Sequence, residues 1–282
     1  MAGVVVTTPR APGLFAALAK RALTAAVGIP LFVWMVAGGP RWMFALLVVA
    51  LSGAAAWELM RMFERAGRTV YGRLGVAGAV AVTVSFLAPG FTATAIVFTV
   101  AVAATLSAPV WADAAPAVEP VAATLLAVSY VGWLLGHGLL LRELPDGTDL
   151  VLFLVGTTWA GESAAYGVGS VVGRHPLSPG ISPRKTVEGA AGQLVASVVT
   201  AAALGAWLLP QWSVAQALLG GGLLGIVGQI GDLGESVIKR SLGVKDTGGL
   251  IPGHGGVLDR LDGLLFNTPA LFYYASWMGG RG

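Results

Sequence analysis

Nine long apolar stretches, separated by short polar or proline-containing segments, dominate the pattern of hydrophobic and polar positions along this 282-residue chain. A helix of about 20 apolar residues is long enough to cross the hydrocarbon core of a bilayer. The stretches run over residues 22–39, 42–60, 71–88, 91–111, 118–141, 150–171, 189–209, 213–235 and 261–279. The pattern therefore predicts an all-α, polytopic membrane protein with about nine transmembrane helices.

Charged residues make up only 11% of the chain, and their placement orients the predicted helices. Of the 17 Lys and Arg residues, 14 fall on the side of the N-terminus when nine spans are threaded through the membrane. Cytoplasmic loops carry such an excess, so we expect a cytoplasmic N-terminus and cytoplasmic loops at 173–189 and 236–262. The net charge of +3 fits contact with lipid head groups or nucleotides and predicts no nucleic acid partner. With no cysteine, a disulfide framework and a thiol-ligated metal are excluded.

The distribution of polar residues predicts two domains. Residues 1–115 form about four spans with few chemically reactive groups, and residues 116–282 form a catalytic transmembrane domain that carries both charged loops. Within the first domain, Glu58 lies near Arg61 at the end of a span. A solvated or snorkelling side chain is favoured there over a catalytic one.

Two ionisable residues interrupt apolar sequence in the second domain. His137 is isolated, which favours a core or interfacial histidine over a ligand. Glu162 lies in the middle of a predicted span, where an ionisable side chain is costly and indicates a functional cavity. The alternative for Glu162 is a polar notch at a span boundary.

The loop at 173–189 contains three prolines within eight residues, which break any helix. Arg184, Lys185 and Thr186 follow at the point where a new helix begins. Helix N-termini with free backbone N–H groups bind phosphate, so this loop is a candidate anion site. An ordinary positively charged cytoplasmic loop is the alternative.

The most charged part of the chain is the segment 236–262, together with Asp232 and Glu235 just before it. On a continuing helix, Asp232, Glu235, Ser236 and Lys239 would share one face. A glycine-rich loop over 244–256 would follow. Carboxylates that hold Mg²⁺, next to cations that clamp phosphates, are typical of phosphoryl or nucleotidyl transfer.

Two features of this segment also have simpler explanations. The run from Asp259 through Arg260 to Asp262 could be an ion-pair network at a helix start, with Asp259 as the cap. His254 stands among glycines and could orient the loop rather than act in acid–base or metal chemistry.

The same residues resemble the signature of the phosphatidate cytidylyltransferase (CDP-diacylglycerol synthase) family. The match runs without a gap through Ser236, Lys239, Arg240, Lys245, Asp246, Gly248, Ile251, Pro252, His254, Gly255, Gly256, Asp259, Arg260 and Asp262. The loop Ser182–Gly189 resembles a second characteristic segment. One departure is that the family usually has Asn-Asp where this chain has Gly161-Glu162.

The resemblance implies the reaction of CTP with phosphatidate to give CDP-diacylglycerol and pyrophosphate, by in-line attack of the lipid phosphate. It implies catalytic roles for Asp232, Asp246, Asp259, Lys239 and Arg260. It also implies Mg²⁺ bound by Asp232, Asp259 and Asp246, with room for a second, monovalent or divalent, cation. Substrate binding would fall to Ser182, Arg184, Lys185, Thr186, Glu188, Ser236, Arg240, Lys245, His254, Gly255, Gly256 and Asp262.

By the same resemblance, the partners are CTP, phosphatidate and membrane lipids, and a homodimer is expected. The protein would lie in a bacterial cytoplasmic (inner) membrane with its active site on the cytoplasmic side. A CTP-dependent lipid-alcohol kinase is the nearest rival, and it would release CDP instead of pyrophosphate. A CDP-alcohol phosphotransferase lacks support because neither Asp146-Gly nor Asp262-Gly continues into that family's motif. A transporter would leave the charged segment unexplained, and no inverted repeat is evident.

Overall fold

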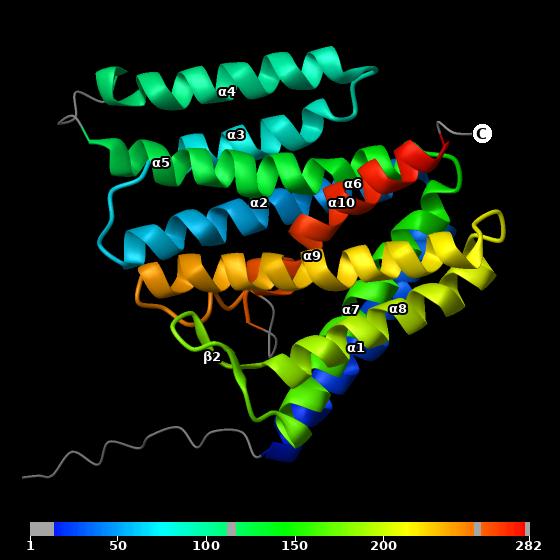
Figure 1. Cartoon of the computed structure of the whole chain (residues 1–282). Coiled ribbons are helices and arrows are strands. Elements are labelled where there is room, and N and C mark those ends of the chain that lie inside the picture. The colour runs from blue at the N-terminus through cyan, green and yellow to red at the C-terminus, as the bar shows by residue number, and fades with distance from the viewer. Residues whose placement is uncertain (1–13, 112–116, 251–254, 280–282) are drawn as a thin grey trace, which may run out of the picture.

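The computed structural model describes residues 14–111, 117–250 and 255–279, and helices make up almost all of it (Figure 1). The helices of the first part are α1 (Leu14–Ala37), α2 (Arg41–Arg65), α3 (Gly72–Ser85) and α4 (Phe91–Trp111). A continuous helical segment follows, made of α5 (Val118–Leu126), the π-helical η1 (Ala127–Trp133) and α6 (Leu134–Glu143). The last helices are α7 (Gly147–Val172), α8 (Val187–Leu208), α9 (Val214–Ser241), the short 3-10 helix η2 (Leu258–Arg260) and α10 (Asp262–Gly279).

Every predicted apolar stretch coincides with a helical segment in the described residues, which confirms an all-α membrane protein at the level of architecture. Five segments are long and apolar enough to cross a membrane: Arg41–Arg65, Phe91–Trp111, Val118–Glu143, Val187–Leu208 and Val214–Ser241. By contrast, α3 has only 14 residues. At 1.5 Å per residue it is about 21 Å long, shorter than a hydrocarbon core of about 30 Å. The count of nine spans and the cytoplasmic N-terminus therefore stay predictions.

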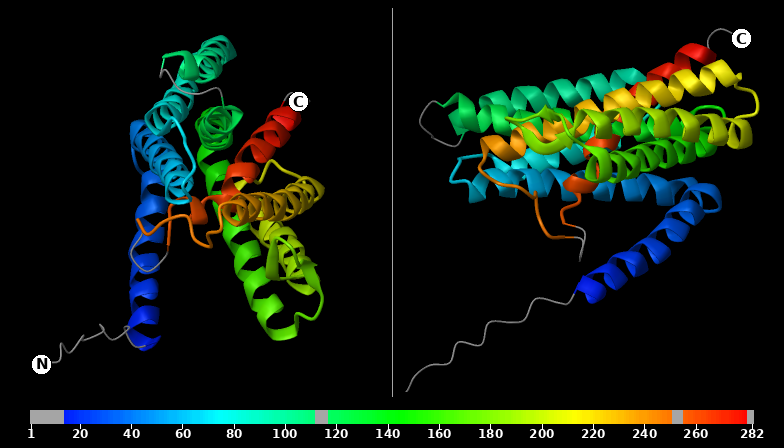
Figure 2. Two further views of the ribbon diagram at one scale, coloured as in Figure 1. Left: turned by 90° about the vertical axis from the view of Figure 1, so that its left-hand side faces the viewer. Right: turned by 60° about the horizontal axis from the view of Figure 1, so that its bottom comes forward.

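The helices form two groups that meet along the middle of the molecule (Figures 1 and 2). In one group α3 packs against α2, α4 and η1, and in the other α8 packs between α7 and α9. Helix α10 lies against α9 and α6 and so joins the groups. Close approach of α8 and α9 depends on small residues, because a Cβ on Gly221 would lie 2.7 Å from the Ser197 carbonyl oxygen.

The loop at 173–189 departs from the purely helical expectation, since it folds as an antiparallel hairpin of β1 (Pro176–Ser178) and β2 (Ser182–Thr186). Thr186 ends the hairpin and caps α8, because its Oγ1 accepts a hydrogen bond from the Gly189 N–H at 3.1 Å. At the other end of the molecule, Ser213 and Gln216 form a capping box that starts α9.

The described residues between α9 and α10, 242–250 and 255–261, contain no helix longer than the short η2, carry most of the family signature and are called the signature loop below. As predicted, α9 continues beyond the apolar stretch to Ser241 before this loop begins. The hairpin and the signature loop lie at the same end of α9 (Figure 1). Arg240 connects the hairpin to the end of α9, because its Nε donates a hydrogen bond to the Ile181 carbonyl at 3.1 Å.

Candidate active site

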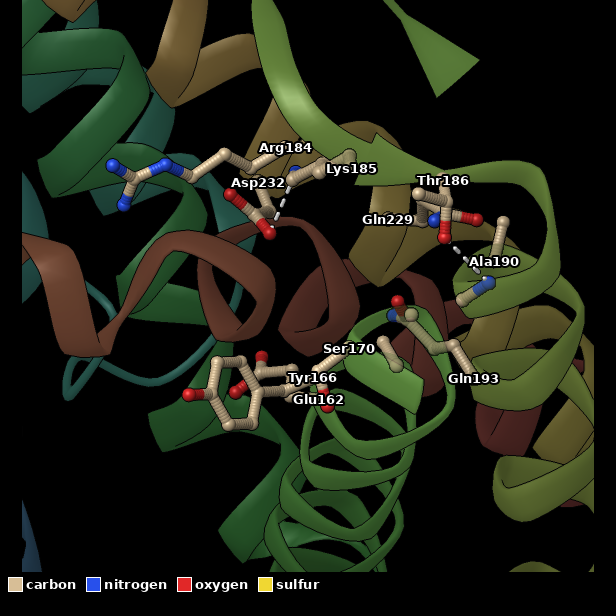
Figure 3. Close-up of a pocket in the computed structure, with 13 residues that line it drawn as sticks. Glu162, Tyr166, Ser170, Arg184, Lys185, Thr186, Ala190, Gln193, Gln229 and Asp232 are labelled. Carbon is tan, nitrogen blue, oxygen red and sulfur yellow. Dashed lines mark hydrogen bonds and ion pairs between the residues drawn. The ribbon is translucent and has the colours of Figure 1, made fainter. Parts of the chain in front are cut away.

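A cavity of about 510 Å³ opens between α7, α8, α9 and the hairpin, next to the charged end of α9 (Figure 3). Four predicted site residues line it: Arg184, Lys185, Thr186 and Asp232. The structure therefore brings the loop at 173–189 and the acidic face of α9 together. The other lining residues are Glu162, Ala165, Tyr166, Gly169, Ser170, Gly189, Ala190, Gln193 and Gln229.

An ion pair joins two walls of the cavity. Lys185 Nζ, from β2, lies 2.6 Å from Asp232 Oδ2 on α9. A dashed line marks this pair in Figure 3. Both side chains are only partly exposed, at 20% and 32%, so the pair remains accessible to a ligand in the cavity. The start of α8 lies beside it, so the positive end of the helix dipole faces the cavity although Thr186 already caps the Gly189 N–H. This wall suits a phosphate group.

The predicted polar face of α9 continues from Asp232 toward the signature loop. Lys239 Nζ lies 3.1 Å from Glu235 Oε1 on the same helix and 2.9 Å from Asp259 Oδ1 at the end of the signature loop. Glu235 is fully buried and Lys239 is 14% exposed. A buried carboxylate is tolerated when a cation compensates its charge, and Lys239 does so for Glu235. The same ammonium group also holds Asp259 in place.

Asp259 is saturated with hydrogen bonds. Its Oδ1 accepts from Lys239 Nζ, and its Oδ2 accepts from the backbone N–H groups of Thr247 (3.0 Å) and Gly256 (3.1 Å) and from Thr247 Oγ1 (3.0 Å). Burial acts to raise the pKa of this carboxyl, but these donors and the charge of Lys239 outweigh burial and lower the pKa. Asp259 therefore connects both parts of the signature loop, at Thr247 and Gly256, to Lys239 on α9.

Further carboxylates converge behind the Lys185–Asp232 pair. Glu162 on α7, Asp232 on α9 and Asp262 at the start of α10 lie close enough for their charges to interact. Glu162 Oε1 rests against Gly263, where a Cβ would collide with it. Neighbouring carboxylates repel one another when they are ionised, and a bound cation would relieve that repulsion.

Comparisons with known proteins identify the family of this chain. The family model described as "Cytidylyltransferase family" matches residues 19–278 of the chain. The chain belongs to the cytidylyltransferase family. Among its relatives is a phosphatidate cytidylyltransferase from Bacillus subtilis (strain 168), 33% identical over 90% of this chain and 96% of the relative.

Other relatives match over a shorter region. A phosphatidate cytidylyltransferase from Synechocystis sp. is 45% identical over 47% of this chain and 45% of its own length. The uncharacterized protein YnbB of Escherichia coli (strain K12) is 43% identical over 54% of this chain and 50% of its own length. The matched region thus spans about half the length of these two relatives, whereas the match to the Bacillus relative covers 96% of that protein.

Mg²⁺ is the metal implied by the family resemblance, and the residues present fit a site that water and substrate phosphates would complete. Within 14–111, 117–250 and 255–279, no three His, Cys, Asp or Glu side chains are placed to hold a metal ion unaided. Mg²⁺ is usually bound by one or two carboxylates and completed by water and substrate phosphates. Asp232, with the charges of Glu162 and Asp262 nearby, fits such a substrate-completed site.

The remaining predicted residues occupy several different environments. Lys245 and Asp246 are exposed on the signature loop, and Gly255 and Gly256 close it around Asp259. Ser236 is buried on α9, and Ser182 begins β2. Arg260 is exposed in η2, and its charge reaches Glu162. His254 lies outside the described residues.

Glu188 has a structural partner in the hairpin. Its Oε1 lies 2.6 Å from His175 Nδ1, and its Oε2 accepts hydrogen bonds from the backbone N–H groups of Arg174 and His175. These contacts tie the start of α8 to the base of β1. The predicted substrate-binding role of Glu188 stays a prediction.

Several polar residues of the site escaped the sequence reasoning. Gln193 and Gln229 line the cavity from α8 and α9. Tyr130 lies on the π-helical segment, where its buried hydroxyl has no hydrogen-bond partner among the described residues. A polar side chain inside an apolar span was the available signal, as it was for Glu162. His137, in contrast, is a core residue, bonded to the Trp133 carbonyl and to Tyr273.

Glu58 contradicts the interpretation as a solvated or snorkelling residue. It is 1% exposed, and its Oε2 accepts a hydrogen bond from the Leu258 N–H at 2.9 Å. The signature loop covers the end of α2. Hydropathy describes each stretch of sequence separately, so it could not predict this contact.

Proposed function

We propose that this protein is a phosphatidate cytidylyltransferase, which converts CTP and phosphatidate into CDP-diacylglycerol and pyrophosphate for phospholipid synthesis. One observation carries the proposal: in a chain of the cytidylyltransferase family, Lys185 and Asp232 meet at 2.6 Å across a cavity that also contains Arg184 and the start of α8. Cations and the positive end of a helix dipole attract the phosphates of a nucleotide, and a carboxylate can hold the metal ion that accompanies them.

The reaction balances without a protein nucleophile. An oxygen of the phosphatidate phosphate forms a bond to the α-phosphorus of CTP while the bond from that phosphorus to the bridging oxygen of the β-phosphate breaks. Pyrophosphate leaves with the electron pair. Because the lipid phosphate is already an anion, no strong general base is needed, and catalysis consists of positioning and charge stabilisation.

The chain's own residues supply that positioning. Arg184, Lys185 and the N-terminus of α8 would hold phosphate oxygens in the cavity, and Lys239 and Arg260 would balance charge near the signature loop. Bound Mg²⁺ would neutralise charge on the phosphates as the pyrophosphate leaves. Asp232 is its foremost proposed ligand. Asp259 and Asp246 are the further ligands expected from the family, and Asp259 would have to exchange some of its present hydrogen bonds for the metal.

The setting is an integral membrane protein with bacterial relatives. We place the cavity on the cytoplasmic side of the inner membrane, where a soluble nucleotide can meet a lipid phosphate. The preponderance of Lys and Arg on that side supports the assignment. A second, monovalent or divalent, cation and a homodimer are part of the same proposal.

The test is an assay of purified protein in liposomes with CTP, phosphatidate and Mg²⁺. We expect pyrophosphate and a CDP-lipid in equal amounts. A lipid alcohol as acceptor, with release of CDP, would replace the proposal by a CTP-dependent kinase. Substrate-dependent uptake without any product would instead indicate a transporter.

A further inference from the structure

Glu58 is the one carboxylate of α2 that contacts the signature loop in the described residues. Its side chain is fully buried, and its Oε2 accepts the Leu258 N–H at 2.9 Å and lies 3.4 Å from Thr247 Oγ1. Leu258 is itself completely buried, so its N–H has no access to water. Loss of Glu58 would therefore leave a buried donor without a partner.

The loop backbone closes tightly around this carboxylate. A Cβ on Gly256 would lie 2.6 Å from Glu58 Oε2, and a Cβ on Gly248 would lie 2.9 Å from Glu58 Cδ. Both distances are shorter than real side chains allow, so a methyl group at either position would displace the Glu58 carboxylate. The two glycines thus have a packing role, which is to let the loop fold over Glu58.

Thr247 connects Glu58 to the charged face of α9. Its hydroxyl lies between Glu58 Oε2 and Asp259 Oδ2, at 3.4 Å and 3.0 Å. Asp259 in turn holds Lys239, whose neighbour on α9 is Glu235. A continuous set of contacts therefore runs from α2 through the signature loop to the helix that carries Asp232.

A buried carboxylate loses its hydration, so an apolar residue at a core position would cost the folded protein less free energy than Glu58 does. We propose that Glu58 is a positioning residue, through which the N-terminal helices hold the signature loop in its catalytic conformation. This inference rests on the proposed function, because the signature loop that Glu58 holds is the loop proposed to act in that reaction. Glu58 acts as a hydrogen-bond acceptor and does not touch substrate.

The decisive experiment compares Glu58→Gln with Glu58→Leu, using Glu64→Gln on the exposed side of the same helix as the control. Gln keeps an acceptor oxygen for Leu258, so its kcat/KM for CTP should stay within about threefold of wild type. Leu removes the acceptor at similar volume and should lower kcat/KM roughly 10- to 100-fold. Glu64→Gln should behave as wild type, because Glu64 pairs only with Arg61 at 3.4 Å among the described side chains.

Hydrogen exchange of the substrate-free protein gives a readout that does not depend on activity. Glu58→Leu should speed exchange of the amides at 255–261 and leave those of α7 and α8 unchanged. If the wild type made no CDP-lipid, the proposed function would fail while this measurement still decided the role of Glu58. A uniform loss of protection would overturn the inference, because it would mean a general role in stability.

A double-mutant cycle keeps the inference testable if Glu58→Leu fails to fold. Gly248→Ala should reduce activity in the wild type, because its methyl group displaces the Glu58 carboxylate. In a Glu58→Ala background the methyl group has room, so Gly248→Ala should cost little more. Additive losses would refute the contact. Equal losses in Glu58→Gln and Glu58→Leu, with normal loop exchange, would show instead that Glu58 acts through its charge.

Discussion

At the scale of single residues, the Lys185–Asp232 pair is the contact on which phosphate binding should depend most. Lys185→Met removes the charge at similar length and leaves Asp232 without its partner in the cavity wall. We expect kcat/KM for CTP to fall at least about 100-fold, the usual scale for losing one preorganised charge-stabilising group. Lys185→Arg should recover part of that loss, because it keeps the charge with a different geometry.

The control for this prediction is Arg174→Gln, which removes a cation from the exposed base of the same hairpin, outside the cavity. Its kcat/KM should stay within about twofold of wild type, since exposed charges contribute little. Steady-state rates at varied CTP measure both variants. Equal effects of the two substitutions would mean that the hairpin acts only through its total charge.

Asp259 makes a prediction about pH. The pKa of its carboxyl is lowered in the folded protein, so the ionised form stabilises the signature loop at every pH above the ordinary value of about 3.9. That stabilisation is lost only as the pH falls below this value and through the lowered pKa. Loop protection from hydrogen exchange should therefore be constant between about pH 8 and pH 5 and should weaken below about pH 4.

Asp259→Asn provides the comparison for that pH profile. The amide cannot accept all the hydrogen bonds from Thr247, Gly256 and Lys239, so we expect an unprotected loop at every pH and little CDP-lipid formation. Helix content by circular dichroism should remain that of wild type. A variant with normal turnover would remove Asp259 from the catalytic machinery altogether.

At the scale of elements, sequence reasoning succeeded where a local period or cap decides the structure. The face shared by Asp232, Glu235 and Lys239 follows from helical spacing, and Thr186 caps α8 at the point where a new helix was expected to begin. The hairpin was missed because prolines and short strands give no alternating pattern. Glu58 was misassigned because its partner, Leu258, is 200 positions away along the chain.

The capping box of α9 gives a prediction that separates stability from activity. Ser213→Ala removes the oxygen that accepts the Gln216 N–H at 3.3 Å and should cost about 1 kcal/mol of stability. Because Ser213 lies at the end of α9 remote from Asp232, turnover of the folded variant should be unchanged. Thermal unfolding in detergent and an assay at low temperature measure the two quantities, and a loss of turnover at full folding would contradict the separation.

At the scale of the whole molecule, the arrangement of the two ends of α7 makes the membrane orientation testable. The hairpin follows α7 at one end, and the turn at 143–147 precedes it at the other. With 26 residues, α7 extends about 39 Å, enough to separate the two connections by a hydrocarbon core. The turn at 143–147 also meets the α8–α9 connection, since Gln211 Nε2 donates to Asp146 Oδ2 at 2.6 Å.

Because the chain contains no cysteine, a single introduced thiol reports the side of each connection without background. Pro179→Cys in the hairpin turn and Pro145→Cys in the turn before α7 are a matched pair of exposed positions. The excess of Lys and Arg predicts that a membrane-impermeant maleimide labels Pro179→Cys only from the cytoplasmic side and Pro145→Cys only from the opposite side. The reverse result would mean that the protein has the opposite orientation in the membrane, with the cavity on the side that lacks CTP. Labelling of both from one side would mean that α7 does not cross the membrane, so the lipid phosphate would have to reach Lys185 by another route.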